Sequence, residues 1–163
     1  MRALLVLVSA LIPGLFGSPV VLPEPVPYHA FCKTLWLFGM PCDDVGSILV
    51  QQILTFSPVN VCEKCHYMLV STSNMSIEVL HNSSENLHSE SIEFILHTTV
   101  LTGSCRVSAQ SSSLALASLL DVGLNYCNLN NLLTASGLNL APGFTEMTSE
   151  WACLGYGFAT CVT

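Results

Sequence analysis

The chain has 163 residues, of which 51% are hydrophobic and only 9% are charged. Eleven acidic residues against four basic ones give a formal net charge of -7 at pH 7. This length corresponds to a single domain. The negative charge argues against nucleic acids and anionic membrane surfaces as partners, because both would repel the chain.

Residues 1–17 predict a signal peptide. Arg2 precedes an apolar run that Pro13 interrupts, and the small residues Gly17 and Ser18 follow. The run of about 14 residues is shorter than the roughly 20 that cross a bilayer. We therefore expect cleavage near Gly17 and a secreted, extracellular chain with no membrane span.

Residues 18–31 contain prolines at positions 19, 23, 25 and 27, which fix the backbone and remove hydrogen-bond donors. This composition predicts a proline-rich extended arm, and we favour a stiff connector over a docking peptide. The arm leads into residues 32–163, which we predict to form a single disulfide-rich α+β domain.

Cysteines are the most informative residues of this domain. Their number is even, and all of them follow the predicted leader: Cys32, Cys42, Cys62, Cys65, Cys105, Cys127, Cys153 and Cys161. In an oxidising compartment this pattern predicts that every cysteine is disulfide-bonded. Eight cysteines can pair in about a hundred ways, and the sequence does not distinguish among them.

The first predicted helix runs from Asp43 to Phe56. Its apolar residues recur with the helical period of about 3.6. Asp43 or Asp44 can cap its start, and Ser57-Pro58 can end it. We expect this helix to pack its apolar stripe against a sheet.

Beyond Cys65 the period shortens to about two, which predicts antiparallel strands. The alternating segments are residues 66–72, 76–80 and 92–100. Gly103 supplies a turn before residues 105–110, so residues 91–110 predict a hairpin. Residues 113–120 are ambiguous between helix and strand, and we favour a strand.

A short second helix is predicted over residues 125–137, from an Asn cap to a glycine. It places four side chains on one face: Tyr126, Leu129, Leu132 and Leu133. The chain after it predicts irregular backbone held by Cys153 and Cys161. The predicted fold class is therefore α+β: an antiparallel β-meander covered by an N-terminal helix, with a short second helix and a disulfide-pinned irregular C-terminus.

Two sequons support export, Asn74-Met75-Ser76 and Asn82-Ser83-Ser84. We predict glycosylation of Asn74 and Asn82 and exposure of residues 73–90. Charged residues are scarce, so Ser, Thr and Asn side chains and any attached sugar have to form the remaining solvent-facing surface.

Cys62-Glu63-Lys64-Cys65-His66 is the sharpest local motif. Such a thiol pair followed by histidine can attach haem, and the pair alone can act in redox chemistry. We favour disulfide-bonded half-cystines, because other cysteines share the chain and no βαβ pattern surrounds the motif. Zinc would need ligands such as His81, His88 and His97, which lack paired spacing. We predict that these three histidines are solvent-exposed, and we expect no metal and no cofactor.

Catalytic arrangements are incomplete. The residue types for hydrolysis are present at Ser104, Asp43, Asp44 and Asp121. The chain nevertheless has no G-x-S-x-G and no H-E-x-x-H motif. Glu146 and Glu150 are one helical turn apart and could act as a general acid and base, but we interpret them as part of an acidic surface. We therefore favour a role without catalysis.

The favoured function is extracellular binding of a protein or a glycan by a secreted, glycosylated, cysteine-rich domain, through loops held on a rigid scaffold. An alternative is a carrier of a small apolar ligand in a cavity between sheet and helix. A hydrolase with an unrecognised site is the least favoured hypothesis.

Overall fold

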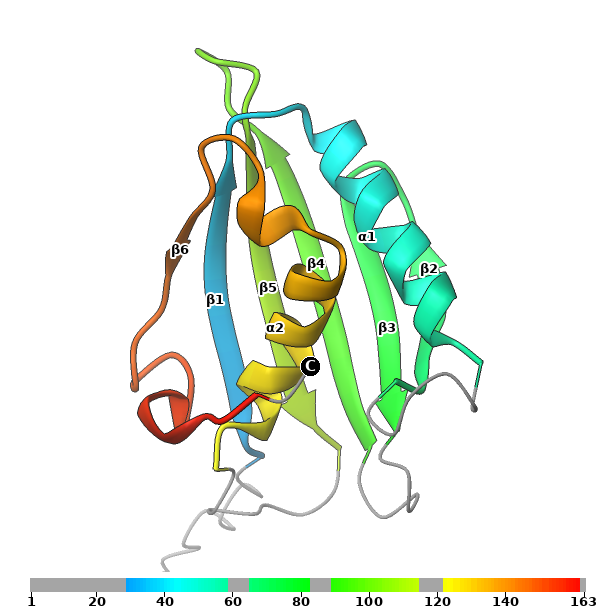
Figure 1. The fold of residues 1–163 in the computed structure, drawn as a ribbon, viewed down its shortest axis with the longest axis vertical. Coiled ribbons are helices and arrows are strands. Elements are labelled where there is room, and N and C mark those ends of the chain that lie inside the picture. Colours follow the sequence, from blue (N-terminus) through cyan, green and yellow to red (C-terminus); the bar gives the residue numbers. More distant parts are fainter. Residues whose placement is uncertain (1–28, 59–64, 83–88, 115–121, 162–163) are drawn as a thin grey trace, which may run out of the picture.

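The computed structural model describes residues 29–58, 65–82, 89–114 and 122–161 (Figure 1). In this part of the chain a six-stranded antiparallel sheet carries two α-helices on one face, which confirms the predicted α+β class. The predicted leader, most of the proline-rich arm and residues 115–120 of the ambiguous segment 113–120 lie outside the described residues.

The elements follow one another as β1 (Phe31–Phe38), α1 (Cys42–Phe56), β2 (Tyr67–Thr72), β3 (Ser76–Asn82), β4 (Ser89–Thr98), β5 (Cys105–Ser113), α2 (Leu124–Ala135), η1 (Leu138–Leu140), β6 (Thr145–Met147) and η2 (Tyr156–Phe158). The strand order is β2-β3-β4-β5-β1-β6. The chain from β2 to β5 is therefore a meander, as predicted, and β1 returns to pair with β5.

Strand β1 was missed by the sequence analysis, and it begins at Phe31, inside the range predicted as the arm. Its burial alternates, with Cys32, Thr34, Trp36 and Phe38 facing the helices. The residues between them include Leu35 and Leu37, which are only half-buried. Apolar residues on both faces hide the period of two that identifies a strand.

Helix α1 confirms the predicted amphipathic helix, because Val45, Leu49 and Ile53 are buried on its sheet-facing side. The predicted cap was wrong. Pro41 is the N-cap residue and makes no side-chain capping bond, while Asp43 and Asp44 lie in the first turn. There their negative charges complement the helix dipole.

Helix α2 also forms where a helix was predicted, and Leu129, Leu132 and Leu133 are buried. Its N-cap is Gly123 and not Asn125. Asn125 is fully buried and accepts a hydrogen bond from the Ser111 hydroxyl at 2.7 Å, so this amide attaches the helix to β5 instead of capping it.

The core fills the space between the sheet and the two helices. Its largest buried side chains include Trp36, Phe38, Leu49, Ile53, Phe94, Leu129 and Leu132. Trp36 on β1 contacts Phe94 on β4 with ring centroids 5.8 Å apart. Each such side chain contributes roughly 1.5 to 3 kcal/mol when it leaves water.

The predicted exposure of residues 73–90 was wrong within the strands. Ile77, Val79 and His81 on β3 and Glu90 on β4 are buried. Strands β3 and β4 extend closer to residues 83–88 than predicted, so their inward faces belong to the core.

Candidate functional site

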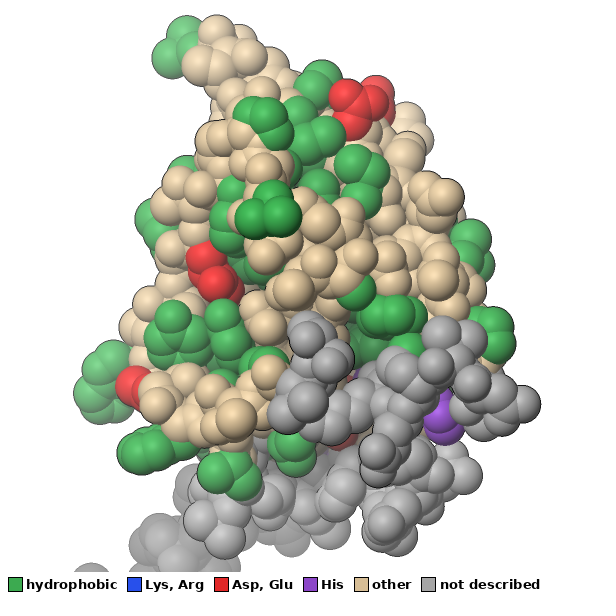
Figure 2. Space-filling model, viewed as in Figure 1, with side chains coloured by type: hydrophobic (Ala, Val, Ile, Leu, Met, Phe, Trp, Pro, Cys, Tyr) green, Lys and Arg blue, Asp and Glu red, His purple; other side chains and the backbone are tan. Residues whose placement is uncertain are grey.

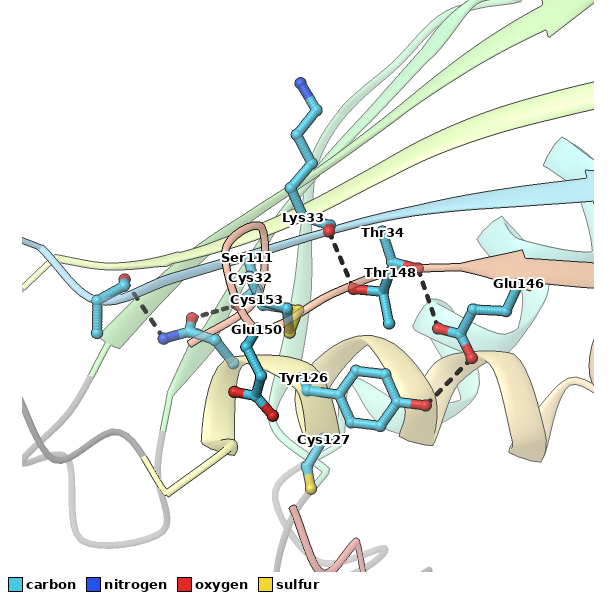
Figure 3. Close-up of a disulfide and its surroundings, with 12 residues drawn as sticks. Cys32, Lys33, Thr34, Ser111, Tyr126, Cys127, Glu146, Thr148, Glu150 and Cys153 are labelled. Carbon is cyan, nitrogen blue, oxygen red and sulfur yellow. Dashed lines mark hydrogen bonds between the residues drawn. A yellow bond between two sulfur atoms is a disulfide. The ribbon is translucent and has the colours of Figure 1, made fainter. Parts of the chain in front are cut away.

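The best candidate site is a C-terminal loop, Ser149–Phe158, which we call the aromatic loop. It lies beside the start of β1, to which it is joined by the Cys32–Cys153 disulfide (Figure 3). The Lys33 amide donates to the Ala152 carbonyl at 2.7 Å, and the Leu154 amide donates to the Phe31 carbonyl at 3.2 Å. One covalent bond and two backbone hydrogen bonds therefore fix the loop to the sheet.

Hydrogen bonds within the aromatic loop restrict it further. The amides of Ala152 and Cys153 both donate to the Ser149 carbonyl, at 3.0 and 2.8 Å. The Gly157 amide donates to the Glu150 carboxylate. Just after the loop, the Cys127–Cys161 disulfide ties the chain to α2. The loop is therefore a rigid feature of the surface.

Large aromatic side chains project from this rigid loop. Trp151 is 94% exposed and Phe158 is 78% exposed. Figure 2 shows hydrophobic side chains gathered over this end of the molecule, where the loop and η2 lie. Exposed aromatic residues on a fixed backbone contribute nothing to the core and are typical of binding surfaces.

A hollow of about 310 Å³ lies beside Trp151. It is lined by Phe31, Glu150, Trp151 and Leu154. This volume lies at the lower end of the range for small-ligand sites, roughly 300 to 1,000 Å³. With three apolar walls and one carboxylate, the hollow suits a single side chain of a partner protein. That side chain would be apolar along its length and polar or basic at its end.

Glu146 supports this region from β6. Its carboxylate accepts hydrogen bonds from the Thr34 hydroxyl at 3.0 Å and the Tyr126 hydroxyl at 3.1 Å (Figure 3). It also accepts one from the Trp36 indole at 3.3 Å. Burial raises the pKa of the Tyr126 hydroxyl, and the Glu146 carboxylate raises it further. Glu146 thus joins β6, β1 and α2, while Glu150 binds the backbone of its own loop.

The predicted acid and base pair is therefore not assembled. Glu146 lies on a strand and Glu150 on the loop, and each carboxylate accepts hydrogen bonds from different donors. The acidic-surface interpretation holds for Glu150, which is exposed, but not for Glu146, which is half-buried.

The described cysteines are all bonded. The disulfides between them are Cys32–Cys153, Cys42–Cys105 and Cys127–Cys161. Cys65 is also disulfide-bonded, so its sulfur is not available for a haem thioether or for redox chemistry in this state. Cys62 lies outside the described residues.

The prediction that His81 is solvent-exposed was wrong. The imidazole is buried and lies 2.8 Å from the Glu90 carboxylate, which is also buried. The His81 ring also contacts the ring of Tyr67, at a centroid distance of 4.5 Å. Burial raises the pKa of the Tyr67 hydroxyl, which donates to the Asn128 carbonyl at 2.9 Å.

The other predicted ligands and catalytic residues are separated. His97 is exposed on β4, Ser104 lies in the β4–β5 turn, and Asp43 lies on α1. Within the described ranges, no group of three or more His, Cys, Asp and Glu side chains could hold a metal ion. His88 and Asp121 lie outside these ranges.

The two sequons have different surroundings. Asn74 is exposed in the turn between β2 and β3. Asn82 is the last residue of β3, and its side-chain oxygen accepts a hydrogen bond from the Ser89 hydroxyl at 2.8 Å. Glycosylation of either residue stays a prediction.

Comparison with family models, curated proteins and solved structures gave no match. None of the helices in the described part of the chain is long and apolar enough to cross a membrane. The site therefore has to be interpreted from its own geometry.

Trp151 and Phe158 were not among the functional candidates predicted from the sequence. The aromatic residues after Ala141 were predicted only as part of an irregular, disulfide-pinned segment. The available signal was their position close to glycines and to the cysteines Cys153 and Cys161, because binding residues often lie on loops that a rigid scaffold positions.

Proposed function

We propose that the protein is a secreted, glycosylated domain that binds an extracellular protein through the aromatic loop. The observation that carries this proposal is the 94% exposure of Trp151 on a loop bonded to β1. Interface residues that dominate binding energy are enriched in tryptophan, tyrosine and arginine. A rigid display also lowers the entropy lost on binding.

The charge of the chain indicates the kind of partner. The formal net charge is -7, and Glu150 lines the hollow beside Trp151. A neutral or basic protein surface would meet this region without repulsion. An apolar side chain of the partner would pack against Phe31, Trp151 and Leu154. A hydrogen-bond donor of the partner would lie near the Glu150 carboxylate.

The disulfides support the extracellular part of the proposal, because such bonds persist in oxidising compartments. The carrier hypothesis is less favoured, because packed side chains such as Trp36, Leu49 and Phe94 occupy the space between sheet and helices. The hydrolase hypothesis is less favoured because the predicted catalytic residues lie on separate elements.

The test is to probe the secreted protein, multimerised on an antibody Fc, against arrays of extracellular protein domains and of glycans. A partner should bind the wild type and bind Trp151→Ala about 30-fold more weakly, which corresponds to roughly 2 kcal/mol at a hot spot. Thermal unfolding of the variant should be unchanged because the side chain is exposed.

Leu140→Ala is the matched control, because Leu140 is 85% exposed but lies on η1, outside the aromatic loop. This control should keep wild-type affinity. The proposal is wrong if every partner found is indifferent to Trp151→Ala, or if only glycans are bound.

A further inference from the structure

A second groove lies between α1 and the β2–β3 turn, away from the aromatic loop. Its volume is about 410 Å³, within the range of small-ligand sites. The buried side chains of Ile77 and Leu96 form its floor, and Val50 of α1 lines it from the helix. The exposed side chains at its rim are polar and include Asp43, Ser47 and Thr72.

Asn74 also lines this groove, and it is the acceptor residue of the first sequon. A glycan on Asn74 would be covalently attached at the edge of the groove, so it is a candidate occupant of the groove. A tethered group binds at a high effective concentration and loses little translational freedom.

The turn that carries Asn74 is firmly built. The Ser73 amide donates to the Ser76 carbonyl at 2.8 Å, and the Ser73 hydroxyl accepts from the amides of Met75 and Ser76 at 3.3 and 3.0 Å. The Leu96 amide of β4 donates to the Met75 carbonyl at 2.8 Å. The attachment point is thus fixed relative to the floor of the groove.

The chemistry of the groove suits an N-acetylglucosamine residue. This sugar combines hydroxyl and acetamide groups with apolar C–H faces. The rim offers the Asp43 carboxylate and the hydroxyls of Ser47 and Thr72, and the floor offers aliphatic carbon. The Ser47 hydroxyl donates to the Asp43 backbone carbonyl at 2.7 Å and can still accept a hydrogen bond. A purely apolar ligand would displace water from the Asp43 carboxylate without replacing its hydrogen bonds, which is unfavourable.

We infer that the groove is the seat of the first sugar of an N-linked glycan on Asn74, so that the glycan is part of the folded structure. The inference rests on the proposed secretion and glycosylation. Asn82 provides an internal comparison, because it does not line this groove and its side-chain oxygen accepts a hydrogen bond from Ser89 elsewhere.

The experiment uses protein secreted from mammalian cells and trimmed by an endoglycosidase to a single N-acetylglucosamine at each occupied sequon. Thermal unfolding is compared with that of Asn74→Gln, and with that of Asn82→Gln. We expect Asn74→Gln to unfold about 3 °C or more below the trimmed protein, and Asn82→Gln to show a smaller change.

Occlusion of the groove separates a seated sugar from a general effect of glycosylation. Ser47→Trp should remove the stabilisation by the Asn74 sugar, because Ser47 is exposed and lines the groove. Gln51→Trp is the matched control, since Gln51 is exposed on the same helix and does not line the groove. It should leave the stabilisation intact.

A second measurement does not depend on these variants. Isotope labelling of the acetyl methyl group should give nuclear Overhauser contacts to the methyl groups of Ile77, Val50 or Leu96. Absence of these contacts, or equal stability of trimmed protein and Asn74→Gln, would overturn the inference. An unmodified Asn74 in secreted protein whose binding still depends on Trp151 would overturn it and leave the proposed function standing, whereas failure of secretion would overturn both.

Discussion

His81 and Glu90 form a buried hydrogen-bonded pair on the helix-facing side of the sheet. They are directly opposite each other on β3 and β4, and their side chains are only 9% and 8% exposed. Burying polar groups is costly, and hydrogen bonding between the partners offsets this cost. The sequence offered a signal for this pair, because a period of two continued from Ile77 and Val79 places His81 on the inward face.

We predict that Glu90→Ala lowers the free energy of unfolding by roughly 1 to 3 kcal/mol, because it removes the buried carboxylate that hydrogen-bonds to His81. The double variant His81→Leu with Glu90→Leu should lose less, since it replaces both polar partners by apolar side chains. Urea denaturation measures both effects. Glu78→Ala is the control at an exposed position of β3, and an equal loss for Glu78→Ala and Glu90→Ala would refute the prediction.

Helix α2 is positioned by polar contacts as well as by apolar packing. Asn125, Asn128 and Asn131 recur on its buried side together with the leucines. The Asn125 side-chain oxygen accepts from the Ser111 hydroxyl, and the backbone carbonyl of Asn128 accepts from the Tyr67 hydroxyl. These contacts specify the rotation of the helix, because an amide that lost its partner inside the core would cost roughly 1 to 3 kcal/mol.

The start of α2 also depends on Gly123. This residue has φ +83°, and an added Cβ would lie 2.5 Å from the Cβ of Ala159 and 2.9 Å from the Gly155 carbonyl oxygen. We predict that Gly123→Ala destabilises the protein more strongly than Gly137→Ala. At Gly137, where φ is +74°, an added Cβ would meet nothing within 4 Å.

Gly137→Ala should therefore show only the cost of the backbone conformation, about 1 to 3 kcal/mol. Gly123→Ala should add displacement of the aromatic loop, so that it also weakens partner binding. Chemical denaturation and binding assays on the two variants test this. Equal stability losses, or unchanged binding by Gly123→Ala, would contradict the expected clash.

The disulfides connect parts of the chain that are far apart in sequence. The two cysteines of Cys32–Cys153 are 121 residues apart, and those of Cys127–Cys161 are 34 residues apart. The longer closed loop restricts the unfolded chain more. Only the Cys32–Cys153 disulfide attaches the aromatic loop directly to β1.

We predict that replacing Cys32 and Cys153 by alanine costs about 5 kcal/mol and abolishes partner binding. Replacing Cys127 and Cys161 should cost about 4 kcal/mol and reduce binding less. Non-reducing denaturation and binding measurements compare the two double variants. Stronger loss of binding in the Cys127 and Cys161 variant would show that the loop is held mainly from α2.

Local patterns were sufficient where a segment's structure depends on its near neighbours. The period of α1, the alternation of β4 and the glycine turn before β5 all identified their elements. They succeeded because a helix or a hairpin with one buried face repeats its burial within a few residues. The α+β class followed from the succession of these elements.

The remaining features depend on contacts between distant residues. Strand β1 lies inside the sheet because it pairs with β5 on one side and β6 on the other, and Glu146 becomes half-buried because β6 adds to β1. The pairing of the cysteines and the exposure of Trp151 also depend on contacts between residues that are far apart in the sequence. Segments that meet only after the chain has folded decide whether a side chain is buried, bonded or exposed. The periodicity within each segment does not encode which other segment it will meet.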